Sequence, residues 1–177
     1  RKHGIMFRIT AFLLCALALL GSCANERQDD RTADLRGKSV LVFTGHGDGY
    51  VHENLAASAR MLQEMAAENG FAADTTSDTA VFCDDSLAKY DAIVYANASY
   101  VEPLLDSAQR GAFVGLHAAA CTGRGWEWFT QMIGGRFDFH PPLQRLTLKV
   151  VDQSHPSTAQ LPDTLQTEDE LYVFKRL

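Results

Sequence analysis

An uninterrupted apolar run at residues 39–44, Ser-Val-Leu-Val-Phe-Thr, constrains the fold of this chain most strongly. The run lacks polar alternation, which is typical of a strand buried on both faces of a parallel sheet. A glycine-rich stretch follows, and apolar residues then recur at helical spacing from Leu55 to Ala66. We therefore expect a helix over residues 53–69 that is ended by Gly70.

The rest of the sequence continues this alternation, which predicts a doubly wound parallel α/β sheet. Further strands are expected at residues 71–76, 91–97, 112–116, 146–150 and 171–174, and a short helix at residues 126–133.

Two features of the pattern indicate an incomplete domain. Residues 98–111 are barely long enough for a parallel crossover with its helix. The sequence also ends at Leu177, inside the last expected strand. We therefore expect a truncated or gapped α/β domain over residues 39–177.

The first 23 residues predict a signal peptide that carries a lipid attachment site. Basic residues precede an apolar run at residues 9–20, which is too short to span a bilayer. Residues 20–23, Leu-Gly-Ser-Cys, resemble a lipobox, in which the cysteine is acylated after cleavage. We expect a lipid on Cys23, a polar tether over residues 24–38, and anchoring in the cell envelope outside the cytoplasm, periplasmic or on the surface. A plain secretory signal is the alternative.

Charge and cysteine content narrow the classes of partner. The formal net charge of −6 leaves no basic face, so no nucleic-acid partner is expected. An acidic, neutral-sugar or other small-molecule partner is easier to accommodate. In the predicted domain only Cys83 and Cys121 remain, and they would pair only if the fold brings them within bonding distance.

Ligands of an open parallel sheet bind beyond the carboxyl ends of its strands, so the loops after the first and fourth strands are candidate sites. The first loop, residues 45–52, reads Gly-His-Gly-Asp-Gly-Tyr-Val-His. It would cradle an anionic or polar group at a helix N-terminus, or it is a mobile loop with glycines for turn geometry, which we favour for His46. Its G-x-G-x-G spacing does not fit the dinucleotide turn, G-x-G-x-x-G.

The second loop begins where the strand at residues 112–116 breaks into small residues. This break would project His117 at the top of the sheet, as a nucleophile elbow projects its serine. An imidazole there would be a general base or a metal ligand, because its ordinary pKa lies near the working pH. A histidine satisfied by backbone hydrogen bonds is the alternative.

Other histidines and acidic or aromatic residues extend the candidate site. Proline follows both His140 and His155 and fixes the backbone direction at each. We assign His52, His117 and His140 as candidate ligands of a divalent metal such as zinc, although their spacing is not diagnostic. The acidic run at residues 168–170 would orient a histidine or bind sugar hydroxyls, or it is a solvated charge run.

Three aromatic residues offer a second kind of contact. Trp126, with Trp128 and Phe129, would form a platform for a sugar ring, although such residues at helical spacing are more often part of a core.

Together the motifs resemble the ThuA-like (trehalose utilisation) family over residues 38–177. They are Val-Leu-Val-Phe-Thr at 40–44, Val-His-Glu at 51–53, Ala-Phe-Val-Gly-Leu-His-Ala-Ala at 112–119, Trp-x-Trp-Phe at 126–129, Ile-Gly-Gly-Arg-Phe at 133–137, His-Pro at 140–141, His-Pro-Ser-Thr at 155–158 and Asp-Glu-Leu-Tyr at 169–172. The resemblance implies a flavodoxin-like relative of class I glutamine amidotransferases that is associated with sugars, notably disaccharides oxidised at the ring.

The resemblance also implies what this chain does not do. His117 occupies the elbow position that holds the nucleophilic cysteine in the amidotransferases, and Cys121 lies four residues later. A thiol glutaminase is therefore not expected. Compared with ThuA-like relatives, the sequence lacks most of the helix before Gly111 and the region after Leu177.

Two functions follow from the resemblance and the residues. The first is an envelope enzyme, a sugar-processing lyase, hydrolase or isomerase that acts on a keto-sugar or glycoside through a histidine-lined cleft. In it His117 is the catalytic base or a metal ligand, Glu170 orients the histidines, and the sugar contacts Trp126, Tyr172 and His155. The second is a noncatalytic carbohydrate-binding lipoprotein that uses the same cleft. The sequence predicts no oligomeric state.

Overall fold

The computed structural model describes residues 34–101, 104–105 and 112–175. The chain divides into two units, residues 1–33 and residues 34–177, and only the second is described. The predicted signal peptide, Cys23 and most of the predicted tether therefore lie outside the described residues. Among the described residues, every helix is too short or too polar to span a bilayer.

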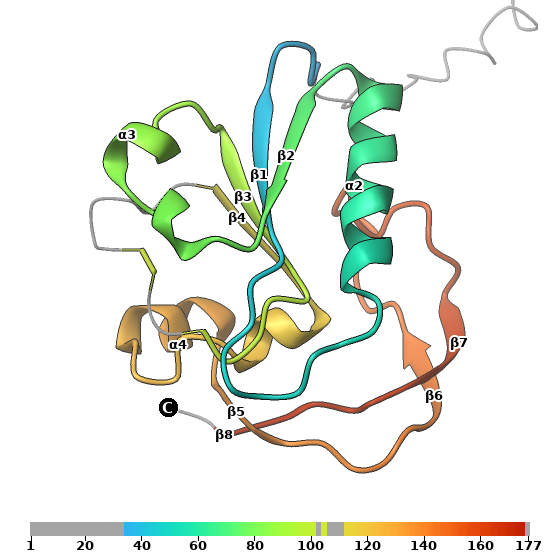
Figure 1. Cartoon of the computed structure of the whole chain (residues 1–177). Helices are drawn as coiled ribbons and strands as arrows, with labels where there is room; N and C mark the ends of the chain where they lie inside the picture. The colour runs from blue at the N-terminus through green and yellow to red at the C-terminus, as the bar shows by residue number, and fades with distance from the viewer. Residues whose placement is uncertain (1–33, 102–103, 106–111, 176–177) are drawn as a thin grey trace, which may run out of the picture. The chain divides into compact units, whose positions relative to one another are not determined.

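Four parallel strands form the central sheet in the order β2-β1-β3-β4 (Figure 1). They are β1 (Ser39–Phe43), β2 (Ala72–Thr76), β3 (Ala92–Ala96) and β4 (Ala112–Leu116). From β1 the chain adds β2 on one side of β1, and it then adds β3 and β4 on the other side. This reversal confirms the predicted doubly wound α/β fold.

The remaining elements cover the sheet or follow it along the chain. The helical segments are α2 (Leu55–Asn69), η1 (Thr79–Val81), α3 (Asp84–Leu87), η2 (His117–Cys121) and α4 (Glu127–Ile133). Two antiparallel pairs complete the described part: β5 (Arg136–Phe139) with β8 (Val173–Lys175), and β6 (Gln144–Lys149) with β7 (Thr164–Asp169).

The helix α2 ends where its sequence predicts. Gly70 adopts a left-handed φ of 77°, and its N–H donates to the carbonyl of Ala66, so the glycine closes the last turn. The helix buries Ala59 and Ala66 and begins at Leu55, two residues later than expected.

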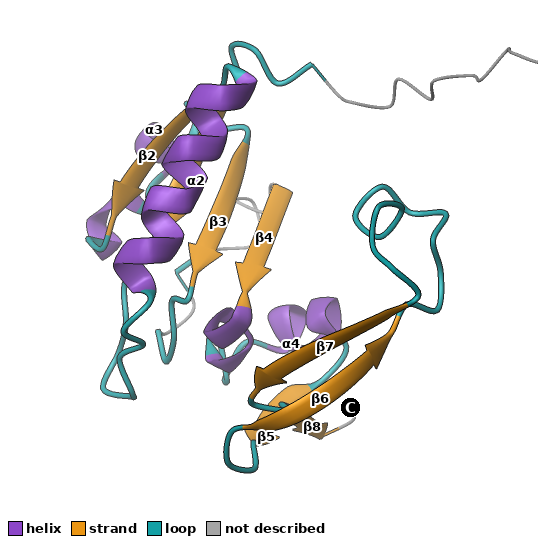
Figure 2. Cartoon of the chain, turned by 90° about the vertical axis from the view of Figure 1, so that its right-hand side faces the viewer, coloured by secondary structure: helices purple, strands orange, loops and turns teal. Residues whose placement is uncertain are grey.

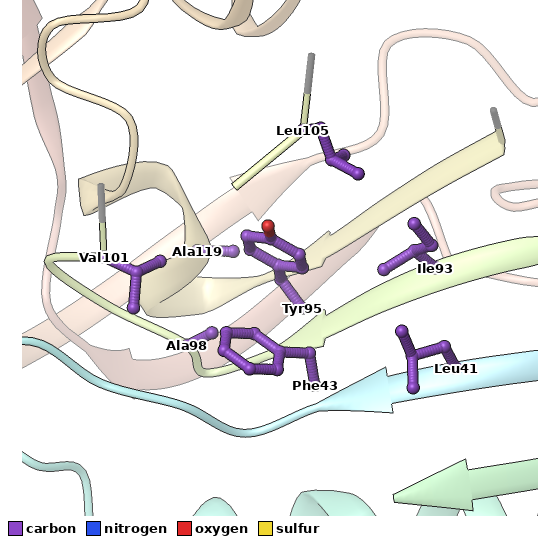
Figure 3. Close-up of a cluster of buried hydrophobic side chains, with 8 residues drawn as sticks. All are labelled: Leu41, Phe43, Ile93, Tyr95, Ala98, Val101, Leu105 and Ala119. Carbon is purple, nitrogen blue, oxygen red and sulfur yellow. The ribbon is translucent and has the colours of Figure 1, made fainter. Parts of the chain in front are cut away.

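Two apolar clusters lie on opposite faces of the sheet because alternate residues of a strand point to opposite sides. Leu41, Phe43, Ile93 and Tyr95 belong to the larger cluster, which Figure 3 shows. Residues of η1 and α3 pack against it, as does Trp126 just before α4. Val42 and Ala96 belong to the other cluster, under Ala59 of α2. Figure 1 shows α2 and α3 on either side of the sheet.

Three expectations differ from the structure at the strands. The apolar run of β4 predicts a buried strand, but β4 is the last strand of the sheet, and Val114 is 48% exposed. β8 begins at Val173, so residues 171–172 precede it. The alternating leucines of β6 are typical of a half-exposed strand, but Leu146 is only partly buried and Leu148 stays exposed. Each expected strand exists, but fewer faces are covered than the apolar patterns predict.

Candidate active site

The loops at the carboxyl ends of the parallel strands supply the first part of the site. Figure 2 shows β3 and β4 pointing toward the short helices that follow β4. The loop after β1 carries Tyr50 and His52, the segment after β3 carries Tyr100, and His117 directly follows β4. Parallel strands place these ends at one edge of the sheet, as the sequence analysis expects for a ligand site.

His117 is the first residue of η2, at the sharp turn that follows β4. Its backbone has a φ of 44°, in the left-handed region that side chains with a Cβ rarely adopt. The following Ala118 and Ala119 are buried, so small side chains fill the space behind the turn. This backbone is the elbow that the small residues predict, with an imidazole at its tip.

Three imidazoles converge near one carboxylate. Oε2 of Glu170 lies 3.6 Å from Nε2 of His117 and 3.7 Å from Nε2 of His140. The rings of His52 and His117 meet edge to face, with centroids 4.9 Å apart. These four residues come from separate segments, so the fold itself assembles the cluster.

The carboxylate oxygen at the centre of this cluster is unusual. Oε2 of Glu170 is buried and accepts no hydrogen bond from the described residues. A buried acceptor without a donor is costly, and in proteins it commonly marks a site where water, a proton or a ligand completes the arrangement. Either of the two imidazoles beside it could donate to it from a protonated Nε2.

Tyr172 joins the histidines to an aromatic wall. Its ring stacks on His140 at 5.5 Å and lies 4.8 Å from Phe137. Its hydroxyl oxygen is 3.4 Å from Nε2 of His117. Burial is the largest cause that raises the pKa of Tyr172, and Cys121 and Glu170 add to it, so the phenol stays protonated and can donate.

A cavity of about 470 Å³ lies against the cluster. Its lining is mostly aromatic and imidazole, and it comprises Tyr50, His52, Tyr100, Cys121, Phe137, His140, Glu170 and Tyr172. His117 lines a second cavity of about 310 Å³, with Phe113 and Met132. We call the first of these the aromatic pocket.

Two groups on the wall of the aromatic pocket are held neutral. Burial is the main cause that lowers the pKa of His52, the electrostatic interaction with His117 lowers it further, and Glu170 opposes the change. Burial also raises the pKa of the Cys121 thiol. His52 is therefore available as an uncharged acceptor or donor, and Cys121 is not a thiolate nucleophile.

The glycines of the loop at residues 45–52 serve close packing. A Cβ on Gly47 would lie 2.0 Å from the backbone oxygen of Tyr100, and a Cβ on Gly49 would lie 2.0 Å from its ring. Gly47 N–H donates to Ser99 O, and Ser99 Oγ donates to Tyr50 O. The loop is thus fastened to the segment after β3, and this contact fixes two walls of the aromatic pocket.

Other predicted site residues lie elsewhere. Trp126 packs against the larger apolar cluster and stacks on Phe129. Nδ1 of His155 is 2.7 Å from Ser157 Oγ, in the segment between β6 and β7. Glu168 is exposed on β7, and Asp169 ends that strand. His46 is exposed, with Nδ1 3.1 Å from the carbonyl of Gly47. None of them lines the aromatic pocket.

Residues that the sequence analysis did not select complete the site. Tyr50, Tyr100, Cys121 and Phe137 all line the aromatic pocket. Tyr100 follows the carboxyl end of β3, so the rule that pointed to the loops after β1 and β4 also applies to it. Phe137 belongs to β5, and its role depends on pairing that no local pattern predicts.

The candidate metal ligands and the two cysteines of the domain are placed by the fold as follows. Within the described ranges, no group of three or more His, Cys, Asp or Glu side chains is arranged to hold a metal ion. The candidate ligands His52, His117 and His140 share one site but are not set around a common centre. Cys83 is exposed and Cys121 is buried, and both are free thiols.

Comparison with known proteins gives the family. A family profile whose description is trehalose utilisation, ThuA, matches residues 39–177. The chain belongs to the ThuA family. No curated protein matches the chain.

Two solved structures of ThuA family proteins share this fold. One is a ThuA-like protein from Bacteroides uniformis, with a TM-score of 0.63 and 23% identity, over 80% of this chain and 63% of the other. The second is a ThuA-like protein from Parabacteroides merdae, with a TM-score of 0.57 and 18% identity, over 76% of this chain and 62% of the other. The present chain thus spans less than two thirds of the length of either.

Proposed function

We propose that this ThuA family chain is an enzyme that removes a proton next to the carbonyl of an oxidised sugar, such as a 3-keto-glycoside. The observation that carries the proposal is the convergence of His117 and His140 on Oε2 of Glu170, a buried oxygen without a hydrogen bond. Proton transfer needs such a pairing of an imidazole with a carboxylate that favours its protonated form. The carbohydrate association of the family supplies the substrate class.

His117 is the proposed base. Its imidazole stands at the elbow, where the backbone is fixed, and Glu170 would stabilise the imidazolium that forms when the proton is taken. The separation of 3.6 Å exceeds a hydrogen bond, and such distances commonly shorten when substrate binds. Removal of either partner would therefore reduce the rate of proton abstraction.

Tyr172 is the proposed donor to the sugar oxygen. Its hydroxyl lies 3.4 Å from His117 Nε2, so a carbonyl held near both groups would present its adjacent carbon to the imidazole. The raised pKa of Tyr172 keeps the phenolic proton in place for donation to the developing enolate oxygen.

Noncatalytic carbohydrate binding is the second candidate function. The aromatic pocket carries three tyrosines and Phe137, and aromatic faces are suited to sugar rings. This alternative requires the same pocket but no transfer of a proton. It predicts saturable binding with no exchange or product.

Two further parts of the proposal concern the whole protein. We propose that the chain is exported and lipid-anchored at Cys23 in the cell envelope, on the strength of the lipobox-like sequence. A bound divalent metal such as zinc is a separate proposal, from which no step above is derived. Elemental analysis of the purified protein tests the metal, and palmitate labelling lost in Cys23→Ser tests the anchor.

The catalytic proposal is tested by turnover of 3-keto-glycosides. We expect His117→Ala to lower the rate at least about 100-fold, as is usual for loss of a general base. His155→Ala, which changes a histidine far along the chain and outside the aromatic pocket, is the matched control and should stay within about twofold. Equal rates in the wild type and His117→Ala would remove His117 from the mechanism, and sugar binding without turnover in the wild type would favour the binding protein.

A further inference from the structure

Arg124 is a cation that stands beside the aromatic pocket. It lies in the turn between η2 and α4, whose backbone is held at both ends. Gly123 N–H donates to Val101 O, and Trp126 N–H donates to Gly123 O. Thr122 Oγ1 donates to Ala119 O at 2.8 Å. These bonds fix the point from which the Arg124 side chain leaves the backbone.

Two aromatic rings position the guanidinium. Its Cζ is 4.9 Å from the ring centroid of Tyr100 and 5.8 Å from that of Phe137. Both rings line the aromatic pocket. Contact of a guanidinium with aromatic faces restricts the side chain and leaves N–H groups at its edge available for an acceptor.

No carboxylate of the described residues pairs with Arg124, although several other cations are paired. Lys38 bonds Asp91, Lys89 lies near Asp74, and Lys175 bonds Asp138. The side chain is exposed rather than buried, so its charge is solvated until a ligand arrives. Its charge also reaches the pocket wall, because it lowers the pKa of the Cys121 thiol against the larger effect of burial.

We propose that Arg124 is a specificity residue that binds a carboxylate on the sugar, so that the preferred substrate class is an acidic sugar such as a uronic acid glycoside. The inference rests on the proposed function insofar as the aromatic pocket is the sugar site. A planar guanidinium binds a carboxylate through two parallel hydrogen bonds, which a point charge does not reproduce. The sugar ring would lie against Tyr100 and Phe137 while its carboxylate meets the cation beside them.

The test is binding of two matched probes, methyl β-D-glucuronide and methyl β-D-glucoside, which differ only at the C6 group. By calorimetry, wild type should bind the glucuronide more tightly, and this preference should weaken as salt is added. Arg124→Ala should weaken glucuronide binding at least about tenfold and leave glucoside binding within about twofold. Arg124→Lys should recover only part of the loss.

The control is Arg60→Ala, which removes an exposed arginine of α2 and should leave both affinities unchanged. Equal binding of the two probes by wild type, or an equal loss for both in Arg124→Ala, would overturn the inference. Thermal unfolding of each variant separates loss of folding from loss of recognition. Because the assay needs no turnover, charge preference with an inactive enzyme would contradict only the proton-transfer proposal.

Discussion

The left-handed backbone of His117 costs conformational free energy, and this cost can be measured separately from the role of the imidazole. Residues with a Cβ lose about 1–2 kcal/mol in this conformation, whereas glycine does not. We expect His117→Gly to be more stable than His117→Ala by about 1 kcal/mol in urea unfolding, although both lack the imidazole. Equal stability of the two variants would show that the turn relaxes to an ordinary φ and that no elbow is maintained.

A second residue-scale prediction concerns protonation of His52. Its ordinary pKa is 6.5, and in the folded protein the pKa lies lower, first because of burial and then because of His117. Folding therefore gains stability from neutral His52 above pH 6.5, and this contribution is lost as the pH falls through the lowered pKa. We expect wild type to lose more Tm than His52→Asn between pH 7 and pH 5. In NMR spectra the imidazole proton signals of His52 should titrate with a midpoint below pH 6.5. A midpoint above that value would contradict the buried environment.

At the scale of elements, the loop after β1 depends on close contact with the segment after β3. A Cβ on Gly47 would meet a backbone oxygen, which cannot rotate away, so Gly47→Ala should destabilise the protein by about 1–3 kcal/mol. Gly125→Ala is the control, because a Cβ there meets nothing within 4 Å and should change stability by less than about 0.5 kcal/mol. Equal unfolding midpoints for the two variants would refute the packing role of the loop.

Several elements follow closely from local sequence, whereas η1, α3, β5 and β7 were not predicted. The apolar run of β1, the helical spacing of α2 and the stop at Gly70 are local patterns, so each could be predicted. The burial of the strands could not be predicted, because it depends on neighbouring elements. The same kind of apolar run gives a central strand in β1 and an edge strand in β4. Trp126 shows the same limit, since its helical spacing does not say whether it faces a core or a ligand.

At the scale of the whole molecule, the site is a product of topology. His117 and its neighbourhood could be predicted, because the carboxyl edge of a parallel sheet is a general binding place. Glu170 and Tyr172 are also expected to serve this cleft, but no local pattern gives their contacts with His117, because both lie near the far end of the sequence, between β7 and β8. The glycines at residues 45–49 predict turn geometry, whereas in the structure Gly47 and Gly49 leave the room that Tyr100 occupies.

The central claim is that this assembled cluster moves a proton at a sugar carbon, and solvent exchange measures that step directly. A 3-keto-glycoside is incubated in D₂O, and deuterium uptake at the carbon beside the ketone is followed by NMR. We expect uptake well above the buffer rate with the wild type and uptake at the buffer rate with His117→Ala. Uptake at the buffer rate in both, or equally fast uptake in both, would contradict it.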